Sequence, residues 1–460
     1  MSRRCHTPVV PPLAAAVLLA WGPIAAGRAA TPRASRPPNV VVILVDDLGV
    51  GDCGFSGGTD VPTPAIDRFA REGTIFTQAY ATPSCSPTRA ALLTGRYPGR
   101  FGIEDNRPLD GPTAGFDCRE VLLPALLRDH GYATALVGKW HLGRGAHGPL
   151  ARGFDEFTGW IGAAGQYIDP PLVTGDAKTA QAGWVDDLVA ERAVAFIRDH
   201  AAGPFFLHVA FMAAHLPQEA SPEDLARFAH LGGRRQMAAA IISRLDAAMG
   251  RLMRGIREAG VDDDTLVIFT SDNGAEPAVL GTSNGPHRGQ KFDVLEGGIR
   301  VPFAVRWPAA VPAGHSVSAP IHVFDVFATA VAAAGVEPPH PIDGVDLLPH
   351  VRGERAGVPH KRLFWVYNDH ADWRRADQDT NLARRLLAVR EGDWKLVLEG
   401  EDPPRLYDLA TDPGEAHDRA AGEPGRVAAL REAVRDWDAS MVRQVIPADH
   451  PLYGRDRAAR

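Results

Sequence analysis

Short apolar runs alternate with longer stretches of helical periodicity through the first three quarters of the chain. Each run is continuous, and several are rich in β-branched residues, which is typical of strands covered on both faces. These runs occupy residues 40–45, 133–137, 205–211, 266–269 and, with a weaker pattern, 303–305. Helical patterns lie between them at residues 66–72, 87–94, 123–129, 187–200 and 236–258. Strands that alternate with helices predict an α/β domain on a mostly parallel sheet flanked by helices.

The pattern changes after one more helical stretch at residues 323–334. A passage rich in proline and glycine, residues 336–353, indicates a linker. Beyond it the sequence predicts three strands of an antiparallel sheet and a final amphipathic helix. They occupy residues 363–367, 385–389, 394–398 and 426–441, with a tight connection at 391–393. We therefore predict a larger α/β domain, residues 31–353, and a smaller C-terminal α+β domain, residues 354–460.

Residues 1–30 have the pattern of an export signal. Arg3 and Arg4 precede an apolar stretch at residues 9–20, and small residues suited to signal peptidase follow at 25–30. The apolar stretch is short and contains prolines, so it does not fit a membrane-spanning helix. We expect an exported protein, periplasmic or secreted, without stable membrane insertion.

Composition and charge exclude other classes. The chain has 460 residues, of which 45% are hydrophobic, so it has material for a large core. Its net charge is −7 and it contains no basic tract, so we expect no nucleic-acid partner. Four cysteines are too few for a disulfide framework. Cys5 leaves with the signal, and Cys53 and Cys118 could form a disulfide if the fold brings them together.

Cys85 lies in the most informative short motif, Cys85-Ser86-Pro87-Thr88-Arg89. Proline in the first turn places Cys85 at a helix N-terminus, where free N–H groups favour an anion. Arg89 lies one turn further along the same face of the helix. Without further motifs, this pattern would also fit a buried structural cysteine.

Two polar pairs follow two of the predicted strands. Asp46-Asp47 ends the strand at 40–45, and Asp272-Asn273 ends the strand at 266–269. Open α/β sheets place ligand sites at such strand ends, although each pair alone would also fit an ordinary turn. Together the pairs supply four oxygen donors with three formal negative charges, a set suited to Ca²⁺ or Mg²⁺. Their separation along the chain is long, so the site depends on the fold.

Lysines and histidines follow the other strands. Lys139-Trp140-His141 continues the strand at 133–137, and period-two alternation places Lys139 and His141 on one side. His215 follows the strand at 205–211, and Lys291 precedes the motif Glu296-Gly297-Gly298-Ile299-Arg300. Each of these residues alone would also fit a solvated side chain.

Taken together, these motifs resemble those of the type I sulfatases, the formylglycine-dependent, arylsulfatase-like branch of the alkaline phosphatase superfamily. The similarity includes Cys-x-Pro-x-Arg followed by Leu-Leu-Thr-Gly-Arg at 92–96, and Gly-Lys-Trp-His-Leu-Gly at 138–143. It extends in order over residues 39–308 and departs from the family pattern at Phe292-Asp293. The resemblance implies an alkaline-phosphatase-like α/β domain followed by a smaller domain on an antiparallel sheet.

The resemblance also implies a modified residue and a metal. In this family a formylglycine-generating enzyme oxidises the cysteine, here Cys85, to an aldehyde that hydrates to a geminal diol. One divalent cation, expected to be Ca²⁺ with Mg²⁺ as the alternative, is held near it. The implied ligands are Asp46, Asp47, Cys85, Asp272 and Asn273.

The implied reaction is hydrolysis of a sulfate ester. Arg89, Lys139 and Lys291 would offset the charge of the sulfate group while a hydroxyl of residue 85 attacks sulfur. The alcohol would leave with a proton from Lys291 or His215. A base, for which His141 is the candidate, would then promote release of sulfate.

Three interpretations of function remain open from the sequence. The first is a sulfatase that acts on an aryl or carbohydrate sulfate. The second is a phosphate- or phosphonate-ester hydrolase of the same superfamily, since the same charges would stabilise phosphoryl transfer. The third is an idle protein that binds sulfated glycans, if Cys85 is never oxidised. Residues 157–175 carry no pattern that identifies a substrate.

Overall fold

A ten-stranded mixed sheet forms the centre of the computed structural model, which describes residues 36–106, 119–175, 177–369 and 384–442. In spatial order its strands are β12 (His315–Val317), β2 (Thr74–Phe76), β11 (Phe303–Arg306), β9 (Thr265–Ser271), β1 (Asn39–Val45), β8 (Phe205–Ala210), β4 (Ala133–Lys139), β5 (Glu156–Trp160), β6 (Pro171–Thr174) and β7 (Ala177–Ala180). The five strands from β9 to β5 pair in parallel. The mostly parallel α/β sheet predicted from the sequence is therefore confirmed.

Both margins of this sheet contain antiparallel pairs, which the sequence did not predict. β11 runs antiparallel to β9 and β2, and β6 runs antiparallel to β5 and β7. Only two residues separate β6 from β7, and a connection that short permits an antiparallel hairpin but no crossover. All four residues of β7 are exposed, so this strand lacks the apolar alternation by which strands are recognised.

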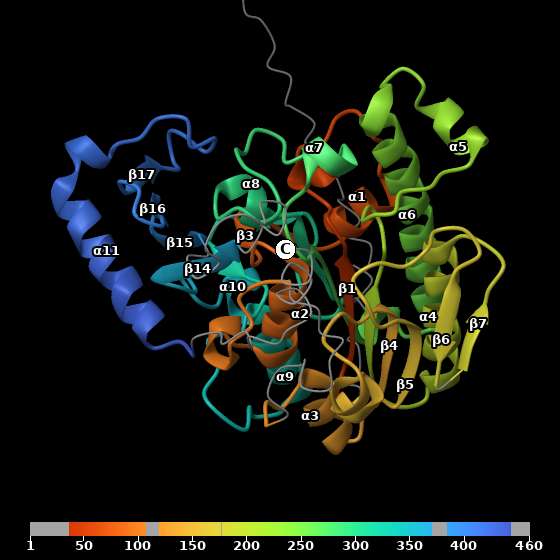
Figure 1. The fold of residues 1–460 in the computed structure, drawn as a ribbon. Coiled ribbons are helices and arrows are strands. Elements are labelled where there is room, and N and C mark those ends of the chain that lie inside the picture. The colour runs from red at the N-terminus through yellow and green to blue at the C-terminus, as the bar shows by residue number, and fades with distance from the viewer. Residues whose placement is uncertain (1–35, 107–118, 176, 370–383, 443–460) are drawn as a thin grey trace, which may run out of the picture. The chain divides into compact units, whose positions relative to one another are not determined.

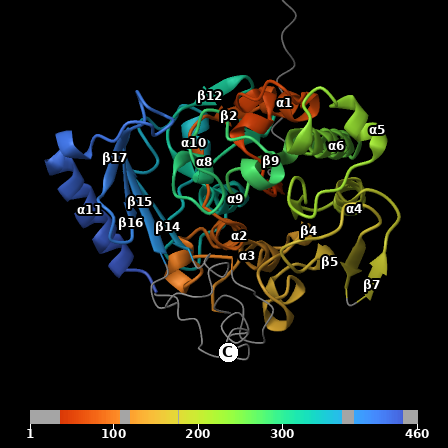
Figure 2. The ribbon, with the colours of Figure 1, turned by 45° about the horizontal axis from the view of Figure 1, so that its top comes forward.

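Helices cover both faces of the sheet (Figures 1 and 2). One layer contains α2 (Cys85–Thr94), α3 (Leu123–Asp129) and α9 (Asp325–Ala334), and the other contains α1 (Pro64–Arg71), α4 (Val185–His200) and α6 (Gly233–Glu258). Alternate residues of β1 belong to the two resulting cores, with Val40, Val42 and Leu44 in one and Val41, Ile43 and Val45 in the other. This burial on both faces is the physical reason for the continuous apolar run.

Shorter elements complete the large domain. A three-stranded sheet contains β10 (Arg300–Val301), β3 (Ala79–Tyr80) and β13 (Ile321–His322). Four short helices are α5 (Pro222–Arg227), α7 (Pro277–Leu280), α8 (Glu296–Ile299) and α10 (Leu348–Val351). The segment predicted as a linker, residues 336–353, includes α10, and its Asp343 accepts a hydrogen bond of 2.6 Å from Nε of Arg100. It is therefore packed and hydrogen-bonded to the large domain.

A four-stranded antiparallel sheet follows, with β14 (Arg362–Asp369), β15 (Arg384–Glu391), β16 (Trp394–Glu399) and β17 (Arg405–Asp408). The sequence predicted all but β17. One face packs on α11 (Pro424–Ala439) through Val389, Leu396 and Leu406. The opposite face contributes Trp365, Ala388 and Val397 to the core shared with α2 and α9.

Three sequence predictions concern residues that the structure does not describe, or describes only in part. The export signal at residues 1–30 lies outside the described residues. Cys53 is buried and carries a free thiol, and Cys118 lies outside the described residues, so the structure gives a disulfide between them no support. Within the described ranges, no helix combines the length and apolarity needed to cross a membrane.

Candidate active site

The two polar pairs meet because β1 and β9 are parallel neighbours. Val45 pairs with Ser271, so the residues that follow each strand leave the same edge of the sheet side by side. The backbone N–H of Asp47 donates to Oδ1 of Asp272 at 3.2 Å, and Nδ2 of Asn273 donates to Oδ1 of Asp47 at 2.7 Å. Pairing of the two strands thus brings together residues that are far apart in the sequence.

Cys85 lies in this cluster at the first residue of α2, as its motif predicted. Its thiol is fully buried and contacts Oδ1 of Asp46 at 3.4 Å. The sulfur and one oxygen each from Asp46, Asp47 and Asp272 all lie within 4.8 Å of one another. Oδ1 of Asn273 is buried and has no hydrogen-bond partner among the described residues. An orphaned amide oxygen beside three carboxylates fits a hard divalent cation.

Three cationic side chains balance the three carboxylates. Lys291 Nζ lies 2.8 Å from Oδ2 of Asp47, and Lys139 Nζ pairs with Oδ2 of Asp46. Arg89 is the partner of the third carboxylate, since its Nη2 donates to Oδ2 of Asp272 at 2.7 Å. The formal charges of these six side chains cancel, so a bound divalent cation would give the cluster a net positive charge.

His141 lies beside these groups, although not for the reason that the sequence suggested. β4 ends at Lys139, and the φ angle of His141 is 57°, so period-two alternation does not extend to this residue. Its backbone N–H donates to the carbonyl of Ile161 at 3.0 Å, and its carbonyl accepts from Oγ of Ser86 at 3.0 Å. Nδ1 of the ring is buried without a hydrogen-bond partner in the described part of the chain.

His215 approaches from the loop after β8. Its Nε2 lies 3.9 Å from Oδ2 of Asp47, and its Nδ1 lies 2.7 Å from the carbonyl of Leu216. Because a carbonyl only accepts, Nδ1 carries the proton in this arrangement and Nε2 of the neutral ring is free to accept. All the predicted site residues therefore converge at one edge of the large sheet.

Burial and nearby charges shift the pKa values of two aspartates of the cluster in opposite directions. Burial would raise the pKa of Asp47, but the charges of Lys291 and Lys139 outweigh it and lower the pKa to about 2. Burial and the neighbouring Asp46 raise the pKa of Asp272 to about 6. Two carboxylates of one cluster thus differ strongly in proton affinity.

The thiol and the histidines are held neutral. Burial, followed by the charge of Asp272, raises the pKa of the Cys85 thiol far above its usual range. Burial and the positive charge of Lys139 lower the pKa of His215 to about 3 and that of His141 well below its usual value. Because a thiol is the weaker nucleophile, unmodified Cys85 is poorly activated here.

Several supporting residues had no signal in the sequence. The hydroxyl of Tyr167 donates to the carbonyl of His215 at 3.0 Å, and Oδ1 of Asp186 accepts from the N–H of Met212 at 2.9 Å. Oδ1 of Asn106 accepts from the N–H of Ser86 at 2.9 Å. These contacts join loops that are far apart in sequence and carry no motif, so no spacing could have revealed them.

Phe292, where the sequence departs from the family pattern, adopts a φ of 75°. Its N–H donates to the carbonyl of Pro83 at 2.8 Å, and its ring lies 5.6 Å from that of Tyr367, measured between centroids. Lys291 still reaches Asp47. The departure therefore alters the wall of the site and leaves the predicted lysine in contact with the cluster.

Comparison with known proteins gives a consistent result. The sulfatase family model matches residues 38–336, and the model of the N-sulphoglucosamine sulphohydrolase C-terminal region matches residues 290–432. Steryl-sulfatase of Mus musculus is 33% identical over 87% of this chain and 80% of its own length. Arylsulfatase A of Homo sapiens is 33% identical over 87% of each chain. Ps i-CgsB, solved in complex with k-i-k-neocarrahexaose, superposes with a TM-score of 0.82 at 30% identity, over 88% of this chain and 94% of that one. The chain therefore belongs to the sulfatase family of the alkaline phosphatase superfamily, and its activity is sulfuric ester hydrolysis.

Proposed function

We propose that this protein hydrolyses the sulfate esters of aryl or carbohydrate alcohols with a formylglycine made from Cys85 and one bound divalent cation. The observation that carries the proposal is the buried convergence of Cys85 with oxygen donors and cationic groups. Asp46, Asp47, Asp272, Asn273 and residue 85 would hold the cation, with Ca²⁺ preferred over Mg²⁺. The hydrated aldehyde would supply a hydroxyl nucleophile, and a cation held beside it would lower the pKa of that hydroxyl.

The cationic side chains would bind and orient the sulfate group. The charges of Arg89, Lys139 and Lys291 cancel those of the three aspartates, so the bound cation leaves a positive excess that favours an anionic ester. Arg89 also donates through Nη1 to the carbonyl of Lys139 at 3.2 Å. Arg89 would therefore hold both the end of β4 and the carboxylate of Asp272 in position.

Lys291 is the favoured proton donor to the departing alcohol. Burial alone would lower its pKa, but Asp47 outweighs burial and raises the pKa well above the usual value, so the ammonium stays charged. His215, the alternative donor, is neutral because its pKa is lowered to about 3. Neutral His141, with an unpaired Nδ1, would act as the base that promotes release of sulfate.

We also propose how the rest of the chain serves this reaction. Residues 1–30 would direct export to the periplasm or the exterior, residues 31–353 would carry the site, and residues 354–460 would brace it. Because Cys85 is fully buried, a formylglycine-generating enzyme would have to modify it before the chain folds.

Matched esters of one alcohol test the proposal. We expect release from 4-nitrophenyl sulfate to exceed release from 4-nitrophenyl phosphate and from a 4-nitrophenyl phosphonate. Cys85→Ala should reduce sulfate release by about a thousandfold or more, because it removes the nucleophile. Cys53→Ala is the matched control, since Cys53 is a buried cysteine in the core between β1 and α1.

Two results would contradict the proposal. Faster turnover of the phosphate or phosphonate ester would favour the second hydrolase class. Absence of turnover from every ester, in protein shown by mass spectrometry to carry the aldehyde, would favour a binding protein.

A further inference from the structure

Phe292 has a backbone conformation that bulky residues rarely adopt. Its φ is 75°, and the N–H of Asp293 donates to the carbonyl of Gln290 at 2.9 Å, which closes a turn at residues 290–293. Phe292 is the third residue of this turn, where a positive φ favours glycine or asparagine because a larger side chain is strained. Strain of this kind clusters at functional sites, so the outlier points to a function for the side chain.

The contacts of this turn join Lys291 to the start of the cysteine motif. The N–H of Phe292 donates to the carbonyl of Pro83 at 2.8 Å, two residues before Cys85. The N–H of Lys291 donates to the carbonyl of Ala275 at 3.0 Å, in the loop after β9. Backbone hydrogen bonds to two other loops therefore hold the turn, and with it the strained backbone of Phe292.

The ring of Phe292 lies against the ammonium group of Lys291. Nζ is over the ring, 5.2 Å from its centroid, which is within the distance of about 6 Å at which a cation and an aromatic face attract. The ring of Tyr367 on β14 lies 5.6 Å away, measured between centroids, at an angle of 30°. Phe292 therefore contacts both the proposed proton donor and the C-terminal sheet.

Lys291 gains from a second contact because its ion-pair partner is shared. Oδ2 of Asp47 lies 2.8 Å from Nζ of Lys291, but Oδ1 of the same carboxylate accepts from Asn273. Asp47 is also a proposed ligand of the cation. An aromatic face attracts an ammonium group without accepting one particular N–H bond, so it does not compete with an alcohol for a proton. The ring therefore suits a lysine that gives a proton to a departing alcohol.

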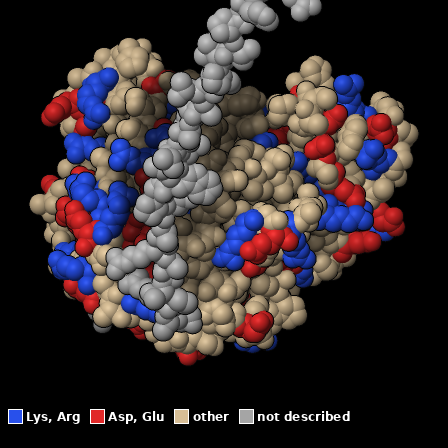
Figure 3. All heavy atoms as spheres, turned by 180° about the vertical axis from the view of Figure 1, so that it is seen from behind, with Lys and Arg blue, Asp and Glu red and all other residues tan. Residues whose placement is uncertain are grey.

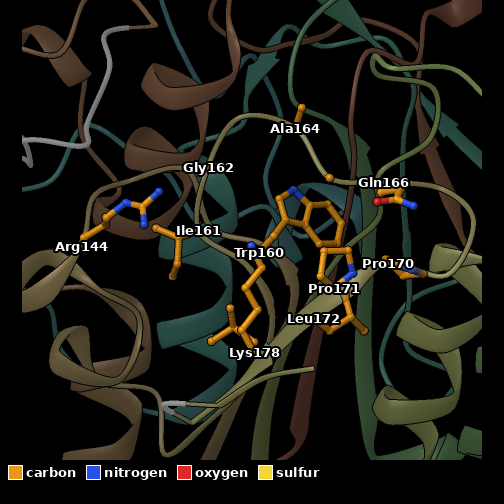
Figure 4. Close-up of a pocket in the computed structure, with 12 residues that line it drawn as sticks. Arg144, Trp160, Ile161, Gly162, Ala164, Gln166, Pro170, Pro171, Leu172 and Lys178 are labelled. Carbon is orange, nitrogen blue, oxygen red and sulfur yellow. The ribbon is translucent and has the colours of Figure 1, made fainter. Parts of the chain in front are cut away.

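The ring of Phe292 lies apart from the largest cleft near the site. That cleft, of about 360 Å³, opens at the carboxyl end of β5, and its walls come from β5, β6, β7 and nearby loops (Figure 4). The described residues that line it include neither Phe292 nor Lys291. Removal of the ring should therefore act on Lys291 without changing the shape of this cleft.

We propose that Phe292 is a positioning residue whose ring holds the ammonium group of Lys291 toward the departing alcohol during cleavage of the sulfate ester. The inference rests on the proposed function and adds a residue that forms and breaks no bond in the reaction. Because Phe292 acts through Lys291, it should influence the reaction only in the step that uses Lys291.

The small number of lysines makes the contact directly measurable. The chain contains five lysines, so protein labelled with ¹³C at the ε-carbon of lysine gives few signals, and Lys291→Arg identifies the signal of Lys291. Protons over the face of an aromatic ring resonate upfield in the NMR spectrum. We expect an upfield shift for the ε-methylene protons of Lys291 in the full chain, its loss in Phe292→Leu and its return in Phe292→Tyr.

The dependence of the rate on the leaving group is the second measurement. Phe292→Leu should lower kcat for a sugar or alkyl sulfate by about fivefold and affect 4-nitrophenyl sulfate less, since 4-nitrophenol leaves with little help from a proton donor. Combined with Lys291→Ala, it should cause no further loss, because the ring then has no ammonium group to hold. Phe292→Tyr keeps an aromatic face and should restore the wild-type rates.

Phe228→Leu is the matched control. The guanidinium of Arg227 lies over the ring of Phe228, 5.5 Å from its centroid, at the end of α5. Phe228 belongs to the core on the opposite face of the sheet from α2. The control thus removes a contact of the same kind away from the site, and it should change neither the signal of Lys291 nor the dependence on leaving group.

The outcomes separate this inference from the proposed function. The inference is overturned if the wild type shows no upfield shift, if Phe292→Leu keeps that shift, or if the losses from Phe292→Leu and Lys291→Ala are additive. The wild-type spectrum decides the contact even if Phe292→Leu does not fold. Failure of the sulfatase proposal appears instead as absent turnover of 4-nitrophenyl sulfate in wild-type protein that carries the aldehyde.

Discussion

Each carboxylate of the site has its own cationic partner: Asp46 with Lys139, Asp47 with Lys291, and Asp272 with Arg89. This pairing keeps the buried charges compensated, since an isolated buried charge would be strongly destabilising. It also gives the two lysines different surroundings. Asp47, the partner of Lys291, is the carboxylate nearest to His215. Different roles for Lys139 and Lys291 follow from this arrangement.

If Lys291 donates a proton to the departing alcohol, the decrease in rate caused by removing its side chain should depend on the leaving group. Lys291→Ala should lower kcat/KM for a sugar or alkyl sulfate by about 10²- to 10⁴-fold, the usual range for general acid catalysis, and should affect 4-nitrophenyl sulfate much less. Rates for a series of sulfate esters whose alcohols differ in pKa measure this effect. The rate of Lys291→Ala should depend more steeply on the pKa of the leaving alcohol than the rate of the wild type. Lys361→Ala, at a side chain that is 81% exposed, is the control. An equal loss for all esters would show that Lys291 is not the donor.

The oxygen donors should hold one divalent cation per chain. Asp272→Asn removes a charge but keeps the shape of the side chain, and we expect it to lower the metal content measured by elemental analysis together with the rate of sulfate release. Chelation of the wild-type protein should abolish activity, and added Ca²⁺ should restore it. Full activity in protein free of divalent metal would refute the assignment.

At the scale of elements, the site depends on how the start of α2 meets the end of β4. Oγ of Ser86 donates to the carbonyl of His141, which lies beyond the end of β4 with a left-handed backbone. This contact holds His141 in place together with the hydrogen bond from its N–H to the carbonyl of Ile161, the residue after β5. A small hydroxyl in the cysteine motif therefore has a positioning role.

Ser86→Ala should leave that carbonyl without its side-chain partner in a buried position. We expect a loss of unfolding free energy of about 1–3 kcal/mol, as for other buried acceptors left unsatisfied, together with a lower kcat. Denaturant unfolding and steady-state kinetics measure the two effects. Ser440→Ala removes an exposed hydroxyl near the end of α11 and should change neither. If Ser86→Ala matches this control in both measurements, the positioning role is wrong.

Some elements could be predicted from the sequence and others could not, for physical reasons. The run at residues 40–45 was recognisable because burial on both faces of β1 leaves no room for polar side chains. β7 was not, because all its residues are exposed. The residues proposed as metal ligands could be named from the sequence, but their meeting depends on the pairing of Val45 with Ser271, which no local pattern specifies. The cleft beside β5 was missed because its walls join several segments without a motif.

At the scale of the whole molecule, a buried ionic network joins the C-terminal sheet to the large domain. Nζ of Lys395 lies 2.9 Å from carboxylate oxygens of both Glu296 and Glu415, and all three side chains are inaccessible to solvent. Burial raises the pKa of Glu415 to about 7, with Glu296 adding to the effect and Lys395 opposing it. The contact between the C-terminal sheet and α8 therefore includes a titrating group.

Glu415 should make stability depend on pH. Its folded pKa is above its unfolded value, so the folded chain binds more protons between about pH 4.5 and pH 7, and stability falls as the pH rises through that window. Glu415→Gln cannot ionise, so its melting temperature should fall less than that of the wild type between pH 5 and pH 8. Thermal melts of both proteins across this range measure the difference. Parallel curves would show that Glu415 does not titrate there.

The net charge of the chain is negative, so it does not attract an anionic ester. On the face shown in Figure 3, basic and acidic side chains are interspersed, and the net charge of the chain is −7. Such a surface does not provide a broad positive field for steering. The positive charge that binds sulfate would therefore come from the buried cluster and its cation.

The most direct test of the central claim is the rate of sulfate release measured against the fraction of residue 85 that carries an aldehyde. Preparations with different extents of Cys85 oxidation, quantified by peptide mass spectrometry, would be assayed with 4-nitrophenyl sulfate. We predict that the rate is proportional to the aldehyde fraction and is zero when only thiol is present. A fully active preparation whose residue 85 is entirely unmodified cysteine would contradict the account.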